Sequence, residues 1–120
     1  MDFENWIKII INTEQPSKEI IGYYFGIFDS GEKKYILYLS GSKEFDSEDD
    51  DWACNDDYTP KDKYFCLNQY QNFGWEDVLN NVVEILQNFI KSDLYYNSFF
   101  AKAKGIATGF DGGDIVLIKY

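Results

Sequence analysis

Residues 44–63 are densely acidic, and this density of charge is the strongest constraint on the fold of the chain. They hold nine acidic residues and two lysines, and so contribute seven of the ten net negative charges of this 120-residue chain. Like charges at this density repel one another and resist burial. The sequence therefore predicts a long surface loop here, and the core must be built from the apolar stretches on either side.

Before the acidic segment, the apolar pattern changes from helical to extended. Residues 2–14 place apolar side chains three and four positions apart, and Asp2 stands where it can cap the resulting helix. Residues 19–28 and 34–39 are rich in β-branched and aromatic side chains, and a turn signal at 29–32 separates them. This half is expected to form a helix followed by a β-hairpin.

After the acidic segment the chain again predicts helix and then hairpin. The expected elements are a short strand at 64–67, helices at 75–91 and 94–103, and a hairpin of strands 105–110 and 114–119. The glycine pair Gly112 and Gly113 suits the turn of that hairpin. Residues 115–118 are apolar throughout, which favours a central strand covered on both faces.

These elements predict a single α+β domain over residues 1–120, with a mainly antiparallel sheet built from two hairpins and helices packed on one face. Aromatic residues make up 19% of the chain, enough for a packed core without disulfides or metals. Cys54 and Cys66 are expected to be reduced and buried. The N-terminal residues lack the character of a signal peptide and no apolar run is long enough to span a bilayer, so a cytoplasmic location is expected.

The residue types argue against an enzyme. The chain has no histidine, the commonest general base, and it lacks Cys-x-x-Cys pairs and glycine-rich phosphate loops. Paired carboxylates, as in glycoside hydrolysis, are the one remaining catalytic option. Residues 46–57 resemble a calcium loop in their acidic spacing, but Asp51 stands where glycine is needed and Asp57 where glutamate is usual. We therefore expect no catalytic residues, no cofactor and no specific metal site.

The charge instead predicts a basic protein as partner. All eleven basic residues are lysines and the net charge is −10, which argues against nucleic acid and anionic membranes as partners. The acidic segment is either a mobile solubilising loop or a recognition surface; Trp52 and Tyr58 favour recognition, although either could fold back onto the core. The candidate contact residues are Glu48, Asp49, Asp50, Asp51, Trp52, Asp56, Asp57 and Tyr58.

The chain has the outline of a small acidic α+β protein with two distinctive stretches. These are the acidic loop from Glu44 to Asp57, with its tryptophan, and the glycine-rich run from Gly105 to Ile115. This outline resembles the immunity proteins of bacterial toxin systems, including those of polymorphic toxins and contact-dependent growth inhibition. The resemblance implies binding and neutralisation of a cognate toxin, with nucleases prominent among such toxins. An acidic mimic of nucleic acid and another kind of small protein-interaction domain remain alternatives, and a carboxylate-dependent enzyme is a further one.

Overall fold

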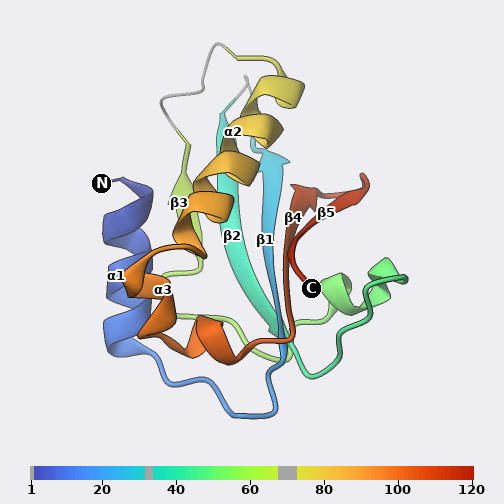
Figure 1. Ribbon diagram of the computed structural model, residues 1–120. Coiled ribbons are helices and arrows are strands. Elements are labelled where there is room, and N and C mark those ends of the chain that lie inside the picture. Colours follow the sequence, from blue (N-terminus) through green and yellow to red (C-terminus); the bar gives the residue numbers. More distant parts are fainter. Residues whose placement is uncertain (1, 32–33, 68–72) are drawn as a thin grey trace.

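The computed structural model describes residues 2–31, 34–67 and 73–120, and it confirms the α+β class (Figure 1). Its elements are, in order, α1 (Phe3–Thr13), β1 (Gly22–Asp29), β2 (Tyr35–Ser42), the 3₁₀ helix η1 (Asp50–Cys54), β3 (Tyr64–Cys66), α2 (Trp75–Phe89), α3 (Asp93–Tyr96), the 3₁₀ helix η3 (Phe99–Lys102), β4 (Gly105–Phe110) and β5 (Ile115–Lys119).

The five strands form one sheet in the order β3-β2-β1-β4-β5. The hairpins β1–β2 and β4–β5 are antiparallel, as predicted, and they join through a parallel pairing of β1 with β4. In that pairing Gly22 lies opposite Gly105. Helices α1, α2 and α3 all lie on the same side of the sheet (Figure 1). The other face is left for the acidic segment.

The main core lies between the helices and the sheet. The amphipathic faces of both long helices are buried there, with Trp6, Ile7 and Ile10 from α1 and Val78, Val82, Leu86 and Phe89 from α2. They pack on alternate strand residues, among them Phe25, which is fully buried. Burying each large apolar side chain contributes roughly 1.5–3 kcal/mol, so this face supplies most of the driving force for folding.

Local signals in the sequence explain the ends of the helices. The Asp2 carboxylate accepts a hydrogen bond of 2.9 Å from the backbone N–H of Asn5, so the predicted cap of α1 is confirmed. The helix predicted at 94–103 is instead two short pieces, α3 and η3. Ser98 separates them, because its hydroxyl donates to the carbonyl of Tyr95 and accepts from the N–H of Phe100.

The expectation that the last strand is central is wrong. Strand β5 is an edge strand, since β4 pairs with it on one side and with β1 on the other. Within β5 only Ile118 is buried, and the rest of the strand is partly exposed. Its turn is close to the prediction: the N–H of Gly113 donates to the carbonyl of Phe110 at 2.9 Å, and Gly112 adopts a φ of +82°.

The cysteines also differ from expectation, because Cys54 and Cys66 are both free and exposed. Side chains alternate along β3, so the burial of Phe65 turns Cys66 outward. In the first hairpin the turn is described as far as Gly31, which has a φ of +116°, while Glu32 lies outside the described residues. No helix in the described ranges has both the length and the apolar character to cross a bilayer.

Candidate functional site

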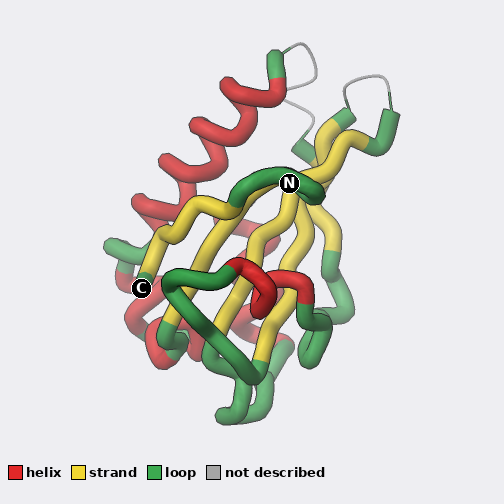
Figure 2. The backbone as a smooth tube through the Cα atoms, turned by 90° about the vertical axis from the view of Figure 1, so that its right-hand side faces the viewer, coloured by secondary structure: helices red, strands yellow, loops and turns green. Residues whose placement is uncertain are grey.

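The acidic segment lies across the sheet face opposite the helices. In Figure 2 the loop and the short helix η1 pass in front of the strands, and the long helices lie behind them. We call residues 43–57 the acidic ridge. The ridge therefore gives the sheet a second, partial layer, and it forms a small core of its own there.

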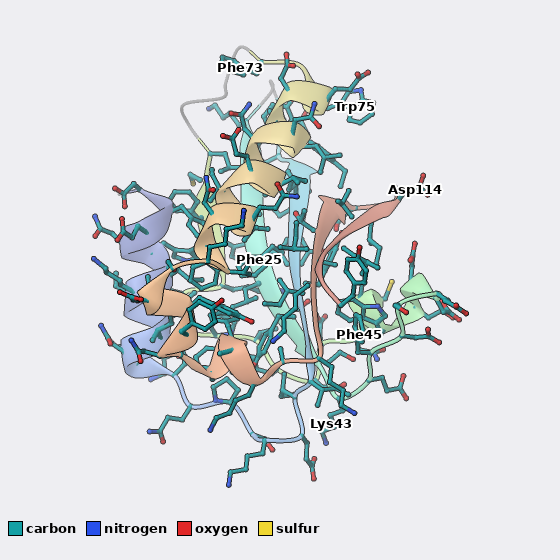
Figure 3. The ribbon with its side chains drawn as sticks, in the orientation of Figure 1. Phe25, Lys43, Phe45, Phe73, Trp75 and Asp114 are labelled. Atoms are coloured by element: carbon teal, nitrogen blue, oxygen red, sulfur yellow. The ribbon has the colours of Figure 1, made fainter. Side chains whose placement is uncertain are left out.

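Two aromatic side chains attach the ridge to the sheet. Trp52 is only 3% exposed, and its ring meets that of Phe45 edge to face at a centroid distance of 5.0 Å. These rings lie over Gly22 and Gly105, where a β-carbon would collide with Trp52 and Phe45 respectively (Figure 3 shows Phe45 beside β4 and β5). The paired glycines thus create the shallow place on the sheet that receives the ridge.

Backbone hydrogen bonds hold the ridge where it leaves and returns to the sheet. Gly41 and Tyr58 form an isolated antiparallel bridge with N–H to carbonyl distances of 2.8 and 3.1 Å. The Asp57 carboxylate accepts from the N–H of Lys43 at 2.9 Å, and the Asn55 amide donates to the hydroxyl of Ser42 at 3.0 Å. Both ends of the ridge are therefore tied together next to the end of β2.

Some of the acidic side chains stabilise the turns of the ridge itself. Asp46 accepts a hydrogen bond from the N–H of Glu48 at 2.8 Å, and Asp49 accepts one from the N–H of Asp51 at 3.0 Å while capping η1. Such local bonds are the reason that aspartate is favoured in turns and at helix starts. Both aspartates are exposed on the surface.

The structure separates the predicted contact residues into two groups. The six acids are exposed: Glu48, Asp49, Asp50, Asp51, Asp56 and Asp57. Trp52 is buried, which corrects the expectation that it contacts a partner directly. Its side chain instead packs between the ridge and the sheet and holds the ridge in place. Tyr58 is half-buried on the helical side, where its hydroxyl donates to Glu14 at 2.8 Å and its ring packs edge to face on Tyr23.

Next to the ridge, two adjoining hollows of about 230 and 300 Å³ open on the same face of the sheet. We call them together the tyrosine hollow. Its lining includes Tyr24, Tyr38, Asp50, Cys54, Asp56, Lys63 and Asp111. They come from two strands, the segment before β3, the ridge and the β4–β5 turn, and their separation along the chain hides this grouping from a reading of the sequence.

Hydrogen bonds orient the polar groups of the hollow. The Tyr38 hydroxyl donates to the Asp111 carboxylate at 2.5 Å, and the Tyr24 hydroxyl donates to the carbonyl of Gly109 at 3.1 Å. Burial raises the pKa of both tyrosines, and the neighbouring negative charge of Asp111 raises them further. Both hydroxyls are therefore neutral donors at neutral pH, and Asp111 faces the hollow as a fixed acceptor.

Among the residues that the structure describes, no three histidine, cysteine or acidic side chains are grouped to hold a metal ion. Comparisons of the chain with models of protein families, with curated proteins and with solved structures found no match. The geometry and charge of this face are therefore the features that indicate a function.

Proposed function

We propose that this protein binds a basic protein through the acidic ridge, and that the partner is a bacterial toxin domain which this binding neutralises. The observation that carries the proposal is the attachment of the ridge: a densely charged segment is held against the sheet by a buried tryptophan. A loop that served solubility alone would not need a buried anchor. The ridge instead presents its carboxylates in a defined arrangement before a partner arrives, which lowers the entropic cost of binding.

The electrostatics of the ridge support a basic partner. Within the described parts of the chain, the ion pairs are Lys8 with Glu4 and Lys43 with Glu19, and neither uses an acid of the ridge. Unpaired acids of one sign create a potential that speeds encounter with an oppositely charged protein and selects against acidic ones. The toxin as partner rests on the resemblance to immunity proteins and on a basic nuclease cleft as the natural counterpart of such a surface.

The direct test measures binding of the purified protein to the toxin-like product of the neighbouring gene, at low and at moderate salt, together with rescue of growth when both are expressed. We expect one tight complex that survives moderate salt, and rescue by the intact protein. Loss of all binding at moderate salt, or a partner whose toxicity continues in the complex, would contradict the proposal.

Two sets of substitutions with the same change in net charge separate the ridge from general electrostatics. The ridge set is Glu48→Gln, Asp50→Asn and Asp51→Asn, and the control set on the helical side is Glu76→Gln, Glu84→Gln and Asp93→Asn. All six positions are exposed. The ridge set should weaken binding by about 2–4 kcal/mol and the control set by less than about 1 kcal/mol. Equal effects would place the interface elsewhere.

A further inference from the structure

We infer that the tyrosine hollow binds an arginine side chain of the protein partner. The inference deepens the proposed function, since it rests on a basic protein as partner and names the group that enters this face. Three carboxylates surround the hollow, Asp50 and Asp56 from the ridge and Asp111 from the β4–β5 turn. In the described part of the chain none of the three forms an ion pair with a lysine.

Aromatic rings form the floor of the hollow and give it a preference for a cation. Tyr24 and Tyr38 meet edge to face at 6.0 Å, and Tyr38 also packs on Phe28 at 6.0 Å. Lys63 also lines the hollow, and its ammonium lies 5.3 Å from the centre of Tyr38 and 5.4 Å from that of Tyr64, so an arginine of the partner would take the place of this ammonium on Tyr38. A positive charge is thus favourable against this floor.

The geometry favours guanidinium over ammonium. A guanidinium is planar, stacks on an aromatic face and offers paired donors that match a carboxylate. The hydrogen bond from Tyr38 occupies one oxygen of Asp111 and fixes the direction of the carboxylate. Asp111 lines the hollow together with Asp50 and Asp56, so one guanidinium can stack on the tyrosine and meet a carboxylate edge on.

The test titrates the ¹⁵N-labelled full-length protein with tri-arginine amide at low salt and follows backbone NMR signals. We expect the largest shifts around Tyr38, Cys54 and Asp111. Tri-lysine amide should bind at least about threefold more weakly, and tri-citrulline amide, which has the same shape without the charge, should not bind measurably. Equal affinity for the arginine and lysine peptides would overturn the assignment of the site to arginine.

A matched pair of substitutions locates the binding. Asp111→Asn and Asp46→Asn remove the same charge, and at each position the carboxylate accepts one hydrogen bond that asparagine can also accept. Asp111→Asn should raise the dissociation constant for tri-arginine by about tenfold, and Asp46→Asn by less than about twofold. Equal effects would overturn the hollow as the site but leave the ridge as an attractor of basic proteins untouched.

A thiol adduct gives a second test that changes no charge. Cys54 lines both parts of the hollow and is exposed, so N-ethylmaleimide can be attached to it in a Cys66→Ser background. The adduct should abolish tri-arginine binding relative to the unmodified Cys66→Ser protein, whereas the same reagent on Cys66 should leave the dissociation constant of the Cys54→Ser protein equal to that of its own unmodified form. Undiminished binding to the Cys54 adduct would overturn the inference. These tests need no toxin. Failure of the inference about the hollow can therefore be distinguished from failure of the proposed function.

Discussion

The indole of Trp52 lies against the backbone of Gly22, so closely that a β-carbon on residue 22 would come within 2.9 Å of Cε3 and Cζ3. The same β-carbon would stand 3.0 Å from the carbonyl oxygen of Glu44. This contact connects the first strand of the sheet to the acidic ridge. It makes a small residue in β1 a requirement for the position of the ridge.

Gly22→Ala should therefore destabilise the protein by about 1–3 kcal/mol, because the added methyl group displaces the indole or the ridge backbone. Gly113→Ala is the control, since its β-carbon would meet nothing closer than 3.4 Å; its effect should stay within about 0.5 kcal/mol. Chemical denaturation measures both. An unchanged stability of the Gly22 variant would show that Trp52 of the ridge does not pack against the backbone of Gly22.

Trp52 should tolerate phenylalanine much better than alanine. Its indole N–H is buried and has no hydrogen-bond partner among the residues that the structure describes, so replacement by phenylalanine sacrifices no polar contact. Trp52→Ala should cost about 3–5 kcal/mol, and Trp52→Phe clearly less. Measured unfolding free energies test the order. Equal losses would show that the N–H, and not the apolar ring, matters at this site.

The buried tyrosines should make stability fall at alkaline pH. Burial raises the pKa of Tyr23 above its usual value, and burial also raises the pKa values of Tyr24, Tyr38 and Tyr58. The unfolded chain then loses these protons from about pH 10 while the folded chain keeps them, so the stability present below that pH is lost as the pH rises.

The loss can reach about 1.4 kcal/mol per pH unit for each tyrosine that ionises only on unfolding. Denaturation curves between pH 8 and pH 11 measure it. Tyr23→Phe should make the decline shallower, because burial alone causes its shift. A decline of the same slope in that variant would assign the effect to other groups.

Both cysteines should react with a thiol reagent in the native state, because both side chains are exposed. We expect rates within about tenfold of those of an unfolded thiol. The single variants Cys54→Ser and Cys66→Ser identify which thiol each rate belongs to. Protection of either thiol by more than a hundredfold would contradict its exposure.

Helix α2 should gain stability from a better cap. Gly74 occupies its N-cap position with extended backbone angles and makes no side-chain hydrogen bond there. A β-carbon at this position would meet no atom of the described residues within 4 Å. Gly74→Ser should therefore raise the unfolding free energy by a few tenths to about 1 kcal/mol, measurable as a higher denaturation midpoint. A lower midpoint would indicate that the glycine is needed for the chain direction before α2.

The sequence alone determined the class of the fold and most of its elements. The spacing of apolar residues predicted α1 and α2, and β-branched residues between turn signals predicted both hairpins. Because these patterns are local, each can be recognised within about a dozen residues. The exposed acids of the ridge were predictable for the same reason, because the cost of burying dense like charge does not depend on the fold.

Only the tertiary structure decided which residues meet. The apolar run of β5 suggested a central strand, but its neighbours depend on how the two hairpins join, which no local pattern records. Trp52 is an internal anchor because Gly22 and Gly105 become partners across a parallel pairing. Tyr38 and Asp111 meet in the tyrosine hollow across 73 positions of the chain for the same reason. Periodicity sets which way a side chain points within its own strand, whereas strand order determines what it faces.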